Sequence, residues 1–138
     1  LMPGVARAQG LIVNRSVDER SDFKKSAFGA ASLIKKICIP ETKKILNRHH
    51  IEYDENDIWF RLLVLHVYHA GAYNVGAVVD KINPNLGTQE LIKSMWQNKA
   101  AGFGNCSQNY SQIAIAAHLI LHDMVYEKCH KLVEKESR

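Results

Sequence analysis

The sequence contains no apolar run near the roughly 18 residues that a membrane-spanning helix needs, so no transmembrane segment is expected. It has only three cysteines, Cys38, Cys106 and Cys129, and their spacing matches neither a zinc ribbon nor a dithiol redox motif. Three thiols cannot all pair within one chain, and the simplest interpretation is that they are buried as small apolar side chains. No segment alternates polar and apolar residues at the strand period, and internal repeats are absent.

The composition is that of a single globular domain spanning residues 1–138, with 46% hydrophobic and 23% charged residues. The net charge of +4 favours polyanionic partners, either nucleic acid or peptidoglycan with its acidic groups. The lysines fall in pairs along expected helices, which is typical of solvated helix faces. Because no helix-turn-helix signature or aromatic–basic platform accompanies them, a nucleic-acid partner is not expected.

Helical periodicity runs through the whole chain and predicts an all-α fold. The expected helices cover residues 22–37, 41–50, 57–69, 72–82, 89–97 and 110–133, with a charged tail at 134–138 expected to fray. Asp22 and Thr88 are suitable N-caps, and Pro40 fits the first position of a separate helix. Gly71 is expected to end the helix before it, since glycine accepts left-handed backbone angles.

The helix expected at 57–69 is apolar on nearly every side, which predicts that it is the buried centre of the domain. Amphipathic helices would then wrap it. The first carries Phe23, Ala27, Ala30, Ile34 and Ile37 on one stripe at helical spacing, and the last is predicted to face inward with Ile113, Ala117, Ile120, Met124 and Val125.

Three short motifs carry a family resemblance. They are the opening Leu1-Met2-Pro3, the stretch Val17-Asp18-Glu19-Arg20-Ser21-Asp22, and Tyr68-His69-Ala70-Gly71 followed by Asn74-Val75. Together they resemble the lysozyme-like catalytic domain of lytic transglycosylases, which cut the glycan strands of peptidoglycan. A shorter stretch, Gly102-Phe103-Gly104 with Tyr110, is similar to the segment before that family's last helix. The resemblance implies a lysozyme-like fold and a periplasmic or cell-envelope location.

The resemblance also implies a reaction and residue roles. The family cleaves the β-1,4 bond between N-acetylmuramic acid and N-acetylglucosamine and forms a 1,6-anhydro product, with one glutamic acid and no cofactor or metal. That glutamate precedes the Leu-Met-Pro turn, so it is expected upstream of residue 1, and this chain alone is expected to be inactive. Tyr68 would orient the acid, while Met2, His69, Tyr73 and Tyr110 would contact the glycan.

Each of these roles has a structural alternative. Tyr68 can be a core tyrosine before a helix-stopping glycine, Met2 plain core, and Tyr110 an ordinary helix-start residue. A second register, with Ala72-Tyr73-Asn74 as the motif, would place glycine inside a helix, which disfavours it by roughly 1 kcal/mol.

Glu19 is a poor substitute for the missing acid. It lies in a polar turn where Arg20 would keep it ionised, so capping and an arginine–carboxylate clamp are the better interpretation. The histidine pairs His66/His69 and His118/His122 have helix-face spacing, but no carboxylate pattern of a metalloprotease helix accompanies them. No metal site is therefore expected.

Two other functions stay open at this stage. The chain can be a non-catalytic glycan-binding relative of the transglycosylases, or an unrelated basic helical module that binds nucleic acid. Whether it belongs to an enzyme depends on the acid expected before Leu1.

Overall fold

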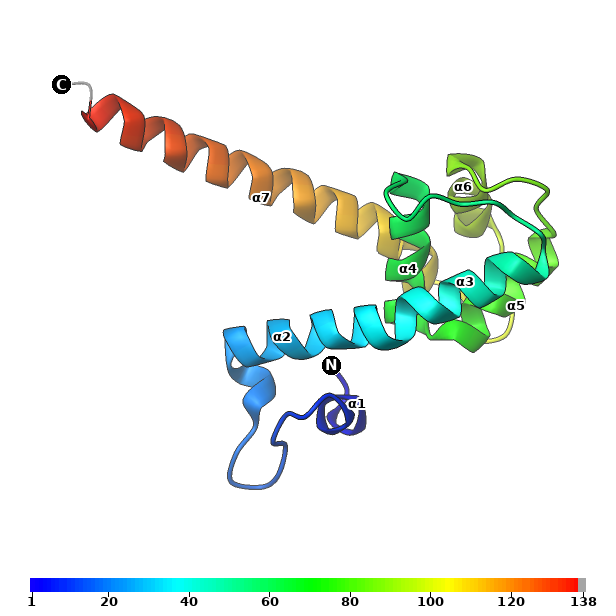
Figure 1. The fold of residues 1–138 in the computed structure, drawn as a ribbon, viewed down its shortest axis with the longest axis horizontal. Coiled ribbons are helices and arrows are strands. Elements are labelled where there is room, and N and C mark those ends of the chain that lie inside the picture. Colours follow the sequence, from blue (N-terminus) through cyan, green and yellow to red (C-terminus); the bar gives the residue numbers. More distant parts are fainter. Residues whose placement is uncertain (137–138) are drawn as a thin grey trace.

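The computed structural model describes residues 1–136, with side chains for residues 1–128, and over this part the fold is all-α, as predicted (Figure 1). Its elements are α1 (Pro3–Ala8), the 3-10 turn η1 (Glu19–Ser21), α2 (Phe23–Leu33), the π-helical turn η2 (Ile34–Cys38), α3 (Ile39–Arg48), α4 (Ile58–Ala70), α5 (Ala72–Ile82), α6 (Gln89–Gln97) and α7 (Cys106–Glu136). In these residues β-structure is limited to two isolated bridges.

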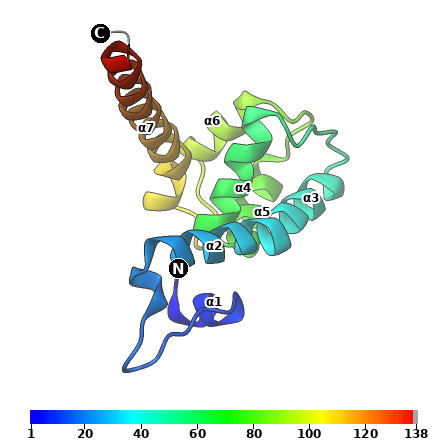
Figure 2. The ribbon, with the colours of Figure 1, turned by 60° about the vertical axis from the view of Figure 1, so that its left-hand side comes forward.

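The central helix is α4, in agreement with its all-round apolar pattern. It is enclosed by α3, α5, α6 and the first turns of α7 (Figure 2). Its buried side chains are Trp59, Phe60, Leu62, Leu63, Val64, His66 and Val67. Gly71 ends α4 with a φ of +83°, a conformation that L-residues rarely adopt, so the predicted stop is confirmed.

The expected break before Pro40 is wrong. Helical backbone angles continue from α2 through η2 into α3, so residues 23–48 form one long helical run. A proline ring inside an α-helix clashes with the carbonyl four residues earlier and removes one hydrogen bond. The π-helical turn at Ile34–Cys38 lies directly before Pro40, where an extra residue in the turn relieves that clash.

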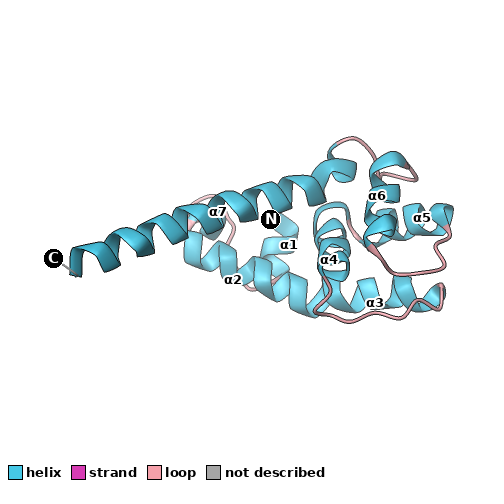
Figure 3. Ribbon diagram, turned by 90° about the horizontal axis from the view of Figure 1, so that it is seen from above, coloured by secondary structure: helices cyan, strands magenta, loops and turns pink. Residues whose placement is uncertain are grey.

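The stripe of α7 predicted to face inward is largely uncovered, and so is the apolar stripe of α2. On α2, Phe23 is 86% exposed, while Ala27 and Ile37 are also exposed and only Ala30 and Ile34 are half-buried. On α7, the exposed fractions reach 62% at Ile120 and 64% at Met124. The reason is that α7 leaves the body after its first turns and extends away from it (Figures 1 and 3).

The N-terminal segment packs on the other side of α2. Leu11 is buried, and a Cβ added at Gly29 would lie 2.6 Å from the Leu11 side chain and 3.2 Å from that of Leu1. Ser32 adds a hydrogen bond to the Gln9 side chain at 2.8 Å. Because Gly29 has no side chain, α1 and Leu1 can lie directly against α2.

The last helix is longer than predicted at both ends. It begins at Cys106 rather than Tyr110, and it continues to Glu136, past the expected end near Val133. The expected fraying is therefore not seen at 134–136, and residues 137–138 lie outside the described part. No helix of that part is long and apolar enough to span a bilayer.

The cysteines differ from one another. Cys38 and Cys106 are both free thiols, and Cys38 is buried as expected. Cys106 is exposed, which contradicts the expectation of burial. The side chain of Cys129 lies outside the described residues.

Gly87 is expected to tolerate no side chain. A Cβ there would lie 2.3 Å from the Trp59 ring and 2.8 Å from Ile51, both of which are buried. We expect Gly87→Ala to lower the free energy of unfolding by about 2 kcal/mol, because neither side chain can move without disturbing the core. Urea unfolding followed by circular dichroism measures this, and Gly104→Ala, whose Cβ would meet only Lys99 at 3.6 Å, is the control. Equal stability of the two variants would contradict the packing described here.

Candidate functional site

A surface hollow of about 560 Å³ lies where the N-terminal segment meets the end of α4. Its lining residues are Leu1, Met2, Val5, Leu33, Tyr68, His69, Ala70 and Gly71. Two motifs far apart in the sequence, Leu1-Met2 and Tyr68-His69-Ala70-Gly71, are thus brought together. Mostly apolar linings with a few polar groups are typical of small-molecule sites.

Tyr68 belongs to both the core and the hollow. Its half-buried ring packs against the hydrophobic core, and the same residue lines the hollow. Among the described residues, the Tyr68 hydroxyl has no hydrogen-bond partner. A phenol placed in this way can form a hydrogen bond with a group that enters the hollow.

His69 and Tyr110 form an aromatic pair beside the hollow. Their rings stack with centroids 4.1 Å apart and an interplanar angle of 10°. His69 is exposed and Tyr110 half-buried. Burial raises the pKa of Tyr110, and the neighbouring Tyr68 contributes to the rise. Tyr68, His69 and Tyr110 therefore form one cluster.

Asn74 connects the end of α4 to the loop before α7, a role that sequence reasoning did not assign. Its Nδ2 donates to the Ala70 carbonyl at 2.8 Å, and its Oδ1 accepts from the Gly102 backbone amide at 2.9 Å. A Cβ at Gly102 would lie 2.9 Å from that oxygen, so the loop approaches closely only because residue 102 is glycine. The only signal in the sequence was that Asn74 and Gly102 each belong to a stretch that resembles the transglycosylase family.

The start of α7 is fixed by a second set of bonds. Gln108 Nε2 donates to the carbonyls of Trp96 and Asn98 at 2.8 and 3.0 Å, and Trp96 Nε1 donates to Ser111 Oγ at 2.9 Å. Gln108 and Ser111 are buried, so these bonds are shielded from water. Tyr110, which lies between them, is held in place against His69.

The other side of the hollow is supported by the predicted clamp. The Arg20 guanidinium donates to both Asp18 carboxylate oxygens, from Nη2 to Oδ2 at 2.6 Å and from Nε to Oδ1 at 2.9 Å, and Arg20 Nη1 also donates to the Leu1 carbonyl at 3.3 Å. This arginine–carboxylate pair confirms the clamp and ties Leu1 to η1. Met2 remains 73% exposed at the rim, so it is not a core residue.

The described residues that line the hollow include no Asp or Glu. Glu19 lies elsewhere, where its carboxylate accepts from Lys25 Nζ at 2.5 Å and from the Ile12 backbone amide at 2.6 Å. These bonds, the first above all, lower the pKa of Glu19. The partner that keeps Glu19 ionised is thus Lys25, and the expectation that Arg20 does so is wrong.

Tyr73 is not part of this cluster. It is 81% exposed and lines a separate hollow together with Arg48, Gly76 and Asp80. The hollow formed by Tyr68, His69 and Met2 does not include it. Because Gly71 stops α4 and Tyr73 lies on α5, the geometry favours the Tyr68 register over the Tyr73 register.

Among the described residues, neither histidine pair is joined by a third metal-ligating side chain, although His118 and His122 line one hollow. His66 is fully buried next to Phe103, with ring centroids 5.5 Å apart, whereas His69 is exposed. His118 and His122 are exposed on α7. Within the described part of the chain, no group of three His, Cys, Asp or Glu side chains lies close enough to hold a metal ion.

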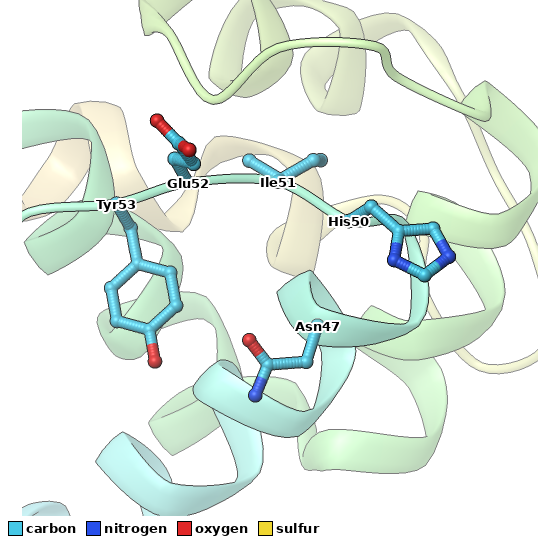
Figure 4. A pocket seen from close by; sticks show the side chains of 5 residues that line it. All are labelled: Asn47, His50, Ile51, Glu52 and Tyr53. Atoms are coloured by element: carbon cyan, nitrogen blue, oxygen red, sulfur yellow. The ribbon is translucent and has the colours of Figure 1, made fainter.

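A larger hollow of about 710 Å³ lies between the end of α3 and the loop that follows it. In Figure 4 the Glu52 carboxylate points to the opposite side of the loop from the Tyr53 ring, His50 points away from both, and only the Asn47 amide lies on the same side as Tyr53. The smaller hollow at Tyr68 is the better candidate, because it joins two motifs that are far apart in the sequence.

Comparison with protein-family models, with curated proteins and with solved structures finds no match to this chain.

Proposed function

We propose that this chain is the glycan-binding part of a peptidoglycan lytic transglycosylase domain that acts in the periplasm or cell envelope. The observation that carries the proposal is the hollow itself. Met2, Tyr68 and His69, which the family resemblance assigns to one site, line a single hollow although Met2 is far from the other two in the sequence. Tyr110, assigned to the same site, stacks on His69.

The shape and chemistry of the cluster suit an amino sugar. The outer face of the exposed His69 ring, backed by the stacked Tyr110 ring, offers a platform for a pyranose ring, and the apolar wall at Val5 and Leu33 can cover an N-acetyl methyl group. The Tyr68 hydroxyl and the His69 ring nitrogens supply hydrogen bonds. The proposed substrate is the bond between N-acetylmuramic acid and N-acetylglucosamine in peptidoglycan.

Under this proposal the chain positions the reaction and another segment supplies the acid. A glutamic acid would protonate the leaving oxygen and then act as a base while the muramoyl 6-hydroxyl closes on C1. Tyr68 would hold that carboxyl in orientation. Because no carboxylate of the described residues lines the hollow, the acid would enter from a segment preceding Leu1.

The same lack of a carboxylate favours one second candidate, a non-catalytic glycan-binding relative. The residues immediately before Leu1 separate the two: a glutamate there supports the enzyme, and its absence together with persistent glycan binding supports the binding protein.

Glycan binding by this chain is the direct test. We expect chitotetraose and soluble uncross-linked peptidoglycan strands to shift amide resonances of Tyr68, His69 and Tyr110 in NMR titrations. Tyr110→Ala should weaken binding about tenfold or more, because the His69 ring loses the aromatic ring that holds it in place.

Tyr73→Ala is the matched control, since it removes an exposed tyrosine outside the hollow. Its affinity should equal that of the unaltered chain. Resonance shifts confined to the surface around Tyr73, or no binding at millimolar glycan, would refute the proposed site.

A further inference from the structure

The middle of α7 is an apolar helix without cover. Between residues 113 and 126 its exposed large apolar side chains are Ile113, Ile115, Leu119, Ile120, Leu121, Met124, Val125 and Tyr126. At 100° per residue they cover most of the helix, and His118, His122 and Asp123 occupy the two strips between them. A helix with apolar side chains on several sides is normally covered by protein, and this stretch is too short to span a membrane.

A second uncovered apolar surface lies on α2. Phe23 and Phe28 are 86% and 72% exposed, and the exposed Ala27 and Ala31 lie between them on the same face. Small residues flanked by aromatic rings allow another helix to approach closely. This face is opposite Leu33, which lines the hollow, so covering it leaves the glycan site open.

The exposed area of the molecule is larger than its mass predicts. A compact monomer of 15.6 kDa exposes roughly 7,300 Å². This chain exposes 9532 Å², an excess of roughly 2,200 Å². If each of two copies lost that excess, the buried total would lie within the roughly 2,000–5,000 Å² of obligate dimers.

Position and charge also suit a second copy. Both α2 and α7 leave the helical body on the same side, so one partner can reach both (Figures 1 and 3). Lys24 and Lys35 lie on the same face of α2 as Phe28 and Ala31, at i,i+4 spacing from them, and form no ion pair with any described residue. Asp123 on α7, which is exposed and lies 3.5 Å from the His122 ring, offers the opposite charge.

We infer that two copies of this chain form a twofold-symmetric dimer in which α7 of each copy packs against α2 and α7 of the other. The symmetry lets the same two surfaces serve both copies, and the contact closes without growing into a filament. Each α7 then has neighbours on more than one side, which covers most of its exposed apolar side chains.

The mass of the 138-residue chain in solution tests the dimer. Sedimentation equilibrium at about ten micromolar protein should give twice the mass of one chain. Ile120→Glu combined with Met124→Glu should weaken association by about 100-fold, and Phe28→Glu alone should weaken it clearly. Leu86→Glu, at a residue 72% exposed in the loop between α5 and α6, is the matched control and should leave the dimer intact.

A cross-link tests the arrangement. Phe28→benzoylphenylalanine in a tagged copy should link under light to α7 of an untagged copy, and circular dichroism should show that every variant stays helical. A monomeric unaltered chain, a dimer insensitive to both sets of substitutions, or cross-links outside α7 would each overturn the inference. So would a longer version of the chain that is monomeric because additional residues cover α7.

Discussion

Acidification from pH 7 to pH 4 should lower the free energy of unfolding by about 3 kcal/mol through His66 alone. Both ring nitrogens of this fully buried side chain are without a hydrogen-bond partner. Burial therefore lowers the pKa of His66 from 6.5 to about 4. The backbone of Ser107, near the ring but without normal hydrogen-bond geometry, opposes the change only in part.

The direction follows from proton binding. Well above pH 6.5 His66 is neutral in both the folded and the unfolded chain, so it does not lower the free energy of unfolding. Between 6.5 and about 4 the unfolded chain binds a proton that the folded chain does not, so stability falls as the pH falls. The lowered pKa values of Asp18 and Glu19 stabilise the fold at neutral pH. The fold loses this stability mainly below the ordinary pKa values of these groups, 3.8 and 4.5. The range from 6.5 to 4.5 therefore reports on His66.

Urea unfolding at several pH values, followed by circular dichroism, measures the effect. His66→Leu should remove most of the dependence, because an apolar side chain of similar size has no proton to gain. His50→Asn is the matched control, since His50 is exposed and its φ of 55° is one that asparagine accepts. A pH dependence that survives His66→Leu unchanged would assign it to other groups.

Tyr68→Phe should lower turnover about 100-fold in a version of the protein that includes the segment before Leu1. The change removes only the hydroxyl, which lines the hollow without a partner among the described residues, so packing of the ring against the core is retained. If that hydroxyl orients the acid, its loss leaves the carboxyl free to rotate. The Michaelis constant should change little, since the sugar platform at His69 and Tyr110 is intact.

Peptidoglycan digestion scored by mass for 1,6-anhydro products measures this turnover. Tyr73→Phe, an exposed tyrosine in a different hollow, should behave like the unaltered protein. If Tyr68→Phe retains full turnover while Tyr73→Phe loses it, the acid is oriented by the second tyrosine and the register chosen here is wrong.

Local features were predicted well from the sequence because their causes are local. Asp22 accepts from the Lys25 amide at 2.9 Å and Thr88 from the Glu90 amide at 3.2 Å, which confirms both N-caps. The bounds of α5 and α6 agree with the expected 72–82 and 89–97. Each depends on residue chemistry within a few positions.

The errors occurred where distant segments decide the outcome. Proline chemistry predicted a break before Pro40, but the π-helical turn absorbs the clash and the helix continues. Glu19 was expected to pair with its neighbour Arg20, yet Lys25 reaches it across the turn into α2 while Arg20 holds Asp18. The order of residues along the chain does not show which of several nearby basic side chains will pair with a given carboxylate.

The sequence by itself determined the helices, their caps and the enclosed position of α4, because periodicity and local bonds define them. Only the tertiary structure decided that Met2 shares a hollow with Tyr68, that Tyr110 stacks on His69, and that Tyr73 lies elsewhere. It also decided which apolar stripes are covered, since periodicity shows that a helix face is apolar but not whether another part of the chain reaches it.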